Sequence, residues 1–182
     1  MFVIIVVVVL AAVAAVLAFA ATRPDTYTVQ REATIAAPAG RIFPYLDDFH
    51  RWATWSPWEK LDPEMKRTFS GAESGPGAVY AWVGNKKVGE GRMEILESEP
   101  PSRLRIQLDF LKPFEAHNTT EFTLEPAGGG TRVNWAMHGN KNFMFKLMGI
   151  FMNMDTMVGR DFERGLASLK AIAETEAAPQ PA

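Results

Sequence analysis

The sequence has no cysteine, and this absence excludes several kinds of chemistry at once. Disulfides, thiolate zinc sites and cysteine nucleophiles all need a thiol, so none of them can form in this chain. The three histidines are His50, His117 and His138, and no two of them have the spacing of metal ligands. Alternation places His117 and His138 on polar strand faces, away from any interior. We therefore predict no metal site, no cofactor and no catalytic residue of the Ser-His-Asp type.

An excess of positive charge is also missing. The chain has 19 basic and 21 acidic residues, a net charge of −2, and no basic cluster. Because binding to nucleic acid needs a positive surface against the phosphates, we predict no nucleic-acid partner. The first 22 residues have no charged side chain, whereas the rest of the chain has the charged fraction of a soluble globular domain.

The uncharged N-terminus is an unbroken apolar run from Phe2 to Ala21. Twenty such residues in a helix span about 30 Å, which is the thickness of the hydrocarbon core of a bilayer. A cleavable signal peptide is the alternative, since Ala18-Phe19-Ala20 resembles a cleavage site. The run is longer than a usual signal h-region and no Lys or Arg precedes it, which favours a retained anchor. We predict a single-pass membrane anchor at residues 1–22 and a linker at residues 23–26.

The side of the membrane on which the domain lies stays open. Arg23, Arg31 and Arg41 all follow the apolar run, and by the positive-inside rule this favours a cytoplasmic domain. A short N-terminal tail that remains inside would place the same domain outside. The sequence predicts membrane localisation without fixing the orientation.

Alternating polar and apolar residues then predict an antiparallel sheet. The first strand covers Tyr27–Ile35, and Arg31 falls on its apolar face. The later strands have one polar and one apolar face and are joined by short turns, as in a meander. They are expected around Phe69 and at Ala78–Val83, Val88–Leu96, Arg103–Phe110, His117–Leu124 and Arg132–His138.

Two short helices are expected between the first and second strands. Pro38 opens the first of them, and Pro44 kinks or shortens it. Three tryptophans follow at three-residue steps, Trp52, Trp55 and Trp58. They form either a small aromatic core that fixes the short helices to the sheet, or the rim of a ligand pocket.

The C-terminal stretch from Asn142 to Glu176 predicts a long helix. Apolar residues recur at three- and four-residue steps from Met144 to Ile172, which aligns them on one face. This is the only long apolar element that can cover the dry face of the sheet. Five methionines between Met144 and Met157 suit an adaptable cavity, so the helix is either plain core or also a ligand wall. Residues 177–182 are expected to be a disordered tail.

Four features together resemble a known family. They are Ala36-Ala37-Pro38 after the first strand, the W-x-x-W-S-P-W segment Trp52–Trp58, the meander, and G-x-D-F-E-x-G-L at Gly159–Leu166. The chain is similar to the START-like (SRPBCC) superfamily, and within it to membrane-anchored bacterial proteins of the polyketide cyclase/dehydrase type. The resemblance covers residues 27–176 and implies an α+β helix-grip fold. That fold has a curved antiparallel sheet of about seven strands around a long C-terminal helix, with a deep apolar cavity between them.

The candidate site consists of residues expected to face that cavity. Two charged residues, Arg31 and Asp155, and one amide, Asn118, occupy inward positions. The charged residues either pair with each other or reach the surface, or they anchor a ligand head group or supply an acid. The predicted ligand-binding residues are Arg31, Trp55, Trp58, Tyr80, Trp82, Met93, Phe110, Asn118, Trp135, Met144, Met148, Phe151, Met152 and Asp155.

The favoured hypothesis is a membrane-tethered module that binds a hydrophobic small molecule, either a lipid or a polyketide-like compound, between the sheet and the C-terminal helix. The alternative is a cyclase/dehydratase-type enzyme that uses Arg31 and Asp155 for polarisation and proton transfer. A third interpretation is a scaffold with a filled core. Binding is favoured over catalysis because no inward histidine, cysteine or tyrosine other than Tyr80 is placed for proton transfer. The oligomeric state stays open.

Overall fold

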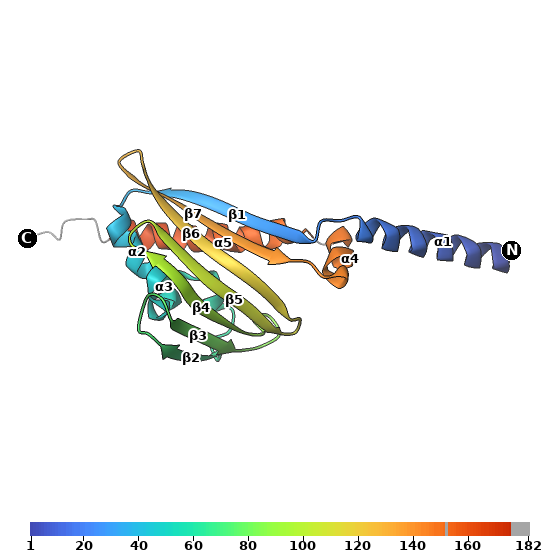
Figure 1. Ribbon diagram of the computed structural model, residues 1–182, viewed down its shortest axis with the longest axis horizontal. Coiled ribbons are helices and arrows are strands. Elements are labelled where there is room, and N and C mark those ends of the chain that lie inside the picture. The colour runs from blue at the N-terminus through green and yellow to red at the C-terminus, as the bar shows by residue number, and fades with distance from the viewer. Residues whose placement is uncertain (152, 176–182) are drawn as a thin grey trace, which may run out of the picture.

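The computed structural model describes residues 1–151 and 153–175 of the chain. A seven-stranded antiparallel sheet has the order β1-β7-β6-β5-β4-β3-β2 and curves around a long C-terminal helix (Figure 1). This is the predicted α+β helix-grip fold. The strands are β1 (Thr26–Ile35), β2 (Lys66–Gly71), β3 (Ala78–Val83), β4 (Glu90–Glu99), β5 (Arg103–Lys112), β6 (Ala116–Ala127) and β7 (Gly130–Asn140).

The helices lie at the two ends of the chain and between the first two strands. They are α1 (Phe2–Ala21), α2 (Ala39–Asp47), α3 (Trp52–Trp55), α4 (Phe143–Phe151) and α5 (Met154–Thr175). Two short 3-10 helices, η1 (Phe49–Arg51) and η2 (Pro57–Lys60), flank α3. The predicted tail at residues 177–182 lies outside the described residues, as does Met152.

The single helix predicted from Asn142 onward is wrong, because two separate helices, α4 and α5, occupy this stretch. Each of them begins after an asparagine whose side chain accepts a backbone hydrogen bond. Asn142 Oδ1 accepts from the N–H of Phe145 at 2.9 Å, and Asn153 Oδ1 accepts from the N–H of Thr156 at 3.1 Å. Such caps replace hydrogen bonds that a helix start lacks, so a second cap at Asn153 starts a new helix.

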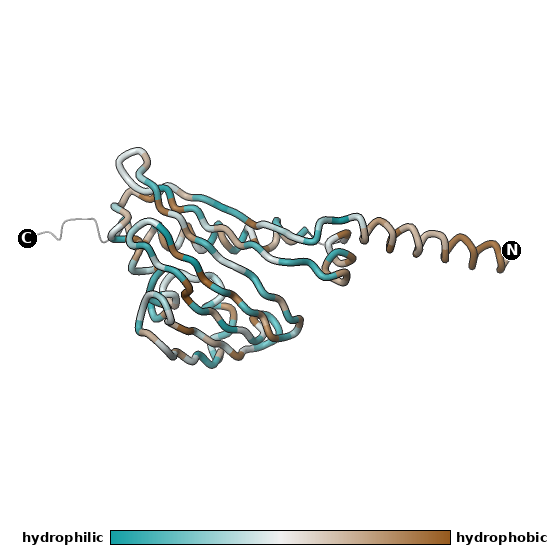
Figure 2. Tube along the Cα trace, viewed as in Figure 1, coloured by the Kyte–Doolittle hydropathy of each residue, from teal (hydrophilic) through white to brown (hydrophobic). Residues whose placement is uncertain are grey.

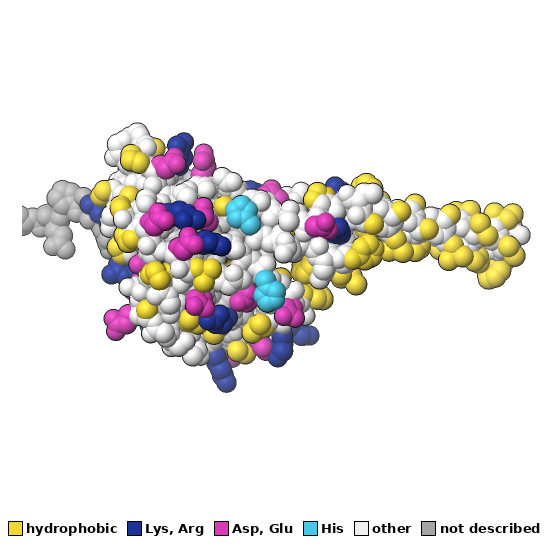
Figure 3. Space-filling model, in the orientation of Figure 1, with side chains coloured by type: hydrophobic (Ala, Val, Ile, Leu, Met, Phe, Trp, Pro, Cys, Tyr) yellow, Lys and Arg dark blue, Asp and Glu magenta, His cyan; other side chains and the backbone are white. Residues whose placement is uncertain are grey.

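The convex face of the sheet is polar. Arg103 contacts Glu97 at 3.0 Å and Glu121 at 2.8 Å, and Arg105 contacts Glu97 at 2.7 Å. Figure 3 shows acidic and basic side chains next to one another across this face. Exposed pairs of this kind add little stability each. Because the convex face is polar, the apolar side chains lie on the concave face, and it is this face that the helices must cover.

Aromatic rings fill the concave face where α5 crosses the sheet. Trp135 of β7 stacks on Phe162 of α5, with ring centroids 4.0 Å apart. Phe122 of β6 and Trp55 of α3 lie 5.0 and 5.5 Å from the Trp135 ring. Gly165 permits this close approach, since a Cβ there would lie only 2.8 Å from Cζ3 of Trp135. Burial of such rings is the main stabilising term of this part of the fold.

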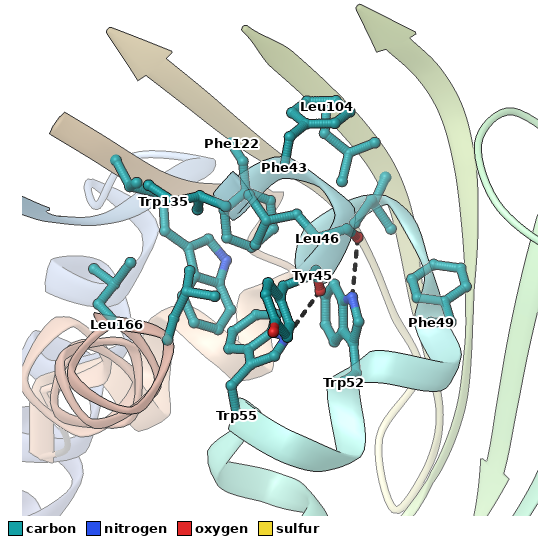
Figure 4. Packing of buried hydrophobic residues seen from close by; sticks show 14 of the residues in the cluster. Phe43, Tyr45, Leu46, Phe49, Trp52, Trp55, Leu104, Phe122, Trp135 and Leu166 are labelled. Carbon is teal, nitrogen blue, oxygen red and sulfur yellow. Dashed lines mark hydrogen bonds between the residues drawn. The ribbon is translucent and has the colours of Figure 1, made fainter. Parts of the chain in front are cut away.

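Two indole N–H groups fix α3 to α2. The Nε1 atom of Trp52 donates to the carbonyl of Leu46 at 3.0 Å, and that of Trp55 donates to the carbonyl of Tyr45 at 2.9 Å (Figure 4). Both tryptophans are buried, so their polar atoms need these partners. The tryptophan segment therefore packs within the core and ties the short helices to it.

The helix α1 extends away from the domain and lies beside α4 at its end (Figure 1). Its side chains are exposed apart from Ala20, and both α1 and α4 consist largely of apolar residues (Figure 2). Within the described ranges it is the one helix long and apolar enough to cross a membrane. A signal sequence passes the same test of length and composition.

Candidate functional site

A pocket of about 670 Å³ lies at the end of the domain from which α1 leaves. Its walls are the linker after α1, the start of β1, α4 and the first turns of α5. This volume falls in the range of about 300–1,000 Å³ that is usual for small-molecule sites. The lining residues are Arg23, Pro24, Tyr27, Thr28, Val29, Lys141, Phe145, Lys146, Met148, Gly149, Ile150, Asn153, Met154, Asp155, Met157 and Val158.

The pocket lies closer to α1 than the cavity that the family resemblance implied. The middle of the concave face is occupied by the stacked rings of Trp135 and Phe162. Beyond them, toward α1, the lining changes to methionines from α4 and α5, among them Met148, Met154 and Met157. Methionine side chains are flexible and polarisable, and they adapt to ligands of irregular shape.

Three basic residues, Arg23, Lys141 and Lys146, line the part of the pocket next to the linker after α1, which we call its mouth. Lys146 is paired with Asp25 of the linker. The guanidinium of Arg23 lies 4.8 Å from the Phe19 ring centroid, and Nζ of Lys141 lies 5.8 Å from that of Tyr27. Among the described residues, neither Arg23 nor Lys141 has a carboxylate within ion-pair distance. The mouth therefore has positive charge that the chain itself does not neutralise.

Arg31 joins the first strand to α5 beside the pocket. Its Nη1 atom contacts Asp155 Oδ1 at 3.0 Å and its Nε atom contacts Glu163 Oε1 at 2.8 Å. Gly159 faces the guanidinium, and a Cβ there would overlap it. The hydrogen bond from Arg31 lowers the pKa of Asp155, and the bonds to Asp155 and Glu163 raise the pKa of Arg31. Arg31 and Asp155 therefore form an ion pair with each other, which is one of the two arrangements expected from the sequence.

A second polar contact lies behind the pocket wall. Tyr27 donates its hydroxyl hydrogen to Asn118 Oδ1 at 2.8 Å, and burial raises the pKa of Tyr27. Asn118 is 2% exposed, and its Nδ2 atom has no partner among the described residues. Gly139, opposite Asn118 on β7, leaves the space that this contact needs. A buried donor without a partner is unfavourable by about 1–3 kcal/mol.

The structure separates the predicted site residues into three groups. Met148 and Asp155 line the pocket, and Arg31 and Asn118 contact residues that line it. Met144 points outward and is 57% exposed, Phe151 is the last residue of α4, and Met152 lies outside the described residues. The remainder belong to the hydrophobic core or pack against it: Trp55, Trp58, Tyr80, Trp82, Met93, Phe110 and Trp135. Contact between a ligand and these core residues stays a prediction.

Several lining residues were not among those predicted. Arg23, Tyr27 and Lys141 come from the linker and strand ends, while Met154 and Met157 come from the start of α5. The methionine-rich stretch was the signal for the last two. Periodicity alone could not show which methionines line the pocket, because the break before α5 resets the helical phase and Met157 lines the pocket although it is 54% exposed. In the described ranges, no group of three or more His, Cys, Asp or Glu side chains is placed to hold a metal ion.

Comparison with protein families gives one match. A family model described as "Polyketide cyclase / dehydrase and lipid transport" matches residues 26–174, which is most of the chain. This range begins with β1 and ends within α5, so it includes every strand of the sheet and excludes α1. No curated protein sequence matches the chain.

Solved structures of low sequence identity share the fold. Protein CV1439 from Chromobacterium violaceum is 17% identical with a TM-score of 0.58, over 84% of this chain and 99% of that one. An uncharacterised protein from Rhizobium leguminosarum is 14% identical with a TM-score of 0.59, over 82% and 95%. DynU16, a protein in the dynemicin biosynthetic locus, is 17% identical with a TM-score of 0.57, over 85% and 49%. At such identities the likeness shows the fold alone.

Proposed function

Because this chain belongs to the polyketide cyclase / dehydrase and lipid transport family, we propose that it binds a hydrophobic small molecule beside a membrane. The observation that carries the proposal is the pocket of about 670 Å³ with methionines on its walls, directly next to the end of α1. Apolar burial provides the affinity for such a ligand, and a few polar groups fix its orientation. A lipid and a polyketide-like compound both have this character.

In this proposal α1 is a retained membrane anchor. Arg23, which lines the pocket, comes two residues after the last residue of α1. A span that ends at Ala21 places Arg23 at the level of the lipid head groups, where basic residues are favourable. A ligand that partitions into lipid would therefore have only a short distance to travel to reach the pocket.

Catalysis of the cyclase or dehydratase type is the second candidate, because the family description includes both reactions. Arg31 and Asp155 would be its polarising and proton-transferring groups. The hydrogen bond from Arg31 lowers the pKa of Asp155, so at neutral pH its carboxyl group has no proton to donate and is also a weak base. This favours binding over catalysis at this site.

The test uses two substitutions in the same helix. Met148→Trp places a large ring at a position that lines the pocket, whereas Met144→Trp adds the same ring at an exposed position. The full chain, expressed in bacteria and purified in neutral detergent, is examined by native mass spectrometry and by analysis of its organic extract. We expect a co-purifying apolar compound with the wild type and Met144→Trp, and its loss with Met148→Trp.

The other outcomes contradict the proposal in different ways. If no compound accompanies any form, and none binds when lipid extract is added, the domain is a scaffold. If the bound compound is converted to a product during incubation, the chain is an enzyme. If Met148→Trp retains the compound as well as Met144→Trp does, the ligand lies elsewhere in the domain.

A further inference from the structure

We infer that the pocket takes an amphiphile with an anionic head group from the membrane leaflet beside α1. This inference rests on the proposed function and names the class of ligand. It comes from three features: the charges at the mouth, the place of the mouth relative to α1, and the apolar surface around it.

The charges at the mouth select the sign of the head group. Three carboxylates lie in or beside the pocket, and all have partners: Asp25 is held by Lys146, and Asp155 and Glu163 by Arg31. Arg23 and Lys141 also line the pocket and have no carboxylate partner among the described residues. Their closest aromatic neighbours, the rings of Phe19 and Tyr27, leave the cationic groups free to bind an anion. A carboxylate or phosphate head group would find two donors there.

The distribution of polarity along the pocket fits a chain attached to such a head. Besides the two basic residues, the half-buried Met148 and Met154 and the more exposed Met157 line the pocket. An alkyl chain gains roughly 0.8 kcal/mol for each methylene that it buries against such walls. An anion without a chain would leave these walls unused, so the ligand is expected to be an amphiphile.

Apolar side chains around α4 indicate the source of the ligand. Phe143 and Met144 of α4 are exposed, as are Leu111 near the end of β5 and Phe114 in the connection between β5 and β6. The Phe114 ring lies 6.4 Å from that of Phe145, so the connection and α4 form one surface. In Figure 3 apolar side chains run without a break from α1 onto this end of the domain. Since α4 contacts α1, this surface lies where a bilayer that contains α1 would begin.

The experiment compares two ligands that differ only in the head group. Oleate is anionic and oleyl alcohol is neutral, and their hydrocarbon chains are identical. The full chain in neutral detergent is mixed with equal amounts of both, and native mass spectrometry gives the ratio of the two complexes. Two exposed charge contacts correspond to about a tenfold preference, so we expect oleate to be favoured by about that factor.

Two double variants with the same change in net charge show whether the mouth is responsible. R23Q/K141Q removes both unpaired cations from the pocket. K66Q/K87Q removes two exposed cations elsewhere, one at the start of β2 and one in the turn between β3 and β4. The preference for oleate should disappear in the first variant and persist in the second. Binding of oleyl alcohol should be equal in all three proteins, because the apolar walls are unchanged.

Each result separates the inference from the proposed function. If oleate and oleyl alcohol bind equally to the wild type, the inference is wrong and hydrophobic binding stands. If neither binds, the proposed function fails as well. Competition by millimolar inorganic phosphate tests the source of the anion. If phosphate displaces oleate, the mouth binds free anions and the membrane origin of the ligand is refuted.

Discussion

The space between the sheet and the C-terminal helices is built in two different ways. At the end near α2 and α3, Trp55, Phe122, Trp135 and Phe162 surround one another with centroid distances of 4.0–6.2 Å. At the end near α1, methionines and a few charged residues line a pocket of about 670 Å³ that is open to solvent on one side. Rigid rings give a fixed packing, and the N–H of Trp55 donates to the carbonyl of Tyr45, whereas flexible thioethers leave room. The fold is therefore stabilised at one end and open to a ligand at the other.

The largest expected difference between the two ends is in stability. Trp55→Ala removes a fully buried ring from the packed end and should lower the free energy of unfolding by about 3–5 kcal/mol. Met148→Ala, at the open end, should lower it by about 1 kcal/mol or less, since this side chain already faces the pocket. Denaturant unfolding of both variants measures the contrast. Equal losses would mean that the two ends are packed alike.

Two glycines of the C-terminal helices, Gly165 and Gly149, should respond in opposite directions when replaced by alanine. In Gly165→Ala the new Cβ would lie 2.8 Å from Trp135 and 3.1 Å from Pro57, so we expect a loss of about 1–3 kcal/mol. Gly149, which lines the pocket, has no other atom within 4 Å of the corresponding position. Gly149→Ala should stabilise the protein by about 0.5–1 kcal/mol, because alanine favours the helix. The melting temperatures of the two variants should move apart, and a destabilised Gly149→Ala would show that α4 is tightly packed.

The fold could be predicted because its signals repeat along the chain. The alternation of polar and apolar residues from Arg103 to His138 predicted both the strands and which of their faces is exposed to solvent. The apolar residues spaced around Phe162 predicted the helix that covers the other face. The break before α5 was missed, because Asn153 lies within an apolar periodic stretch. Only its hydrogen bond to the N–H of Thr156 reveals it as a helix cap.

The site was harder to predict than the fold, since large inward side chains suit a core as well as a pocket. Trp55 and Trp135 were predicted to bind the ligand because they are aromatic and face inward. In the structure both rings pack against other aromatic rings. Arg23 and Lys141 were overlooked, because a lone cation in a linker or at a strand end gives no pattern. What brings them together is the return of β7 alongside β1, which is a property of the sheet.

The smallest expected effect concerns the ion pair between Arg31 and Asp155, near the boundary of the two ends. The pKa of Asp155 is lowered in the folded state, so its stabilising effect is complete above the unfolded pKa, about 3.9, and is lost as the pH falls through the folded value. The Asp155 side chain is 55% exposed, so the pair contributes less than about 1 kcal/mol. Asp155→Asn should reduce stability at pH 7 by no more than this and remove part of the loss below pH 4. Denaturant unfolding at pH values from 3 to 7 measures the free energy of unfolding of both proteins. If this free energy changes with pH in the same way for Asp155→Asn and wild type, the ion pair does not stabilise the folded state.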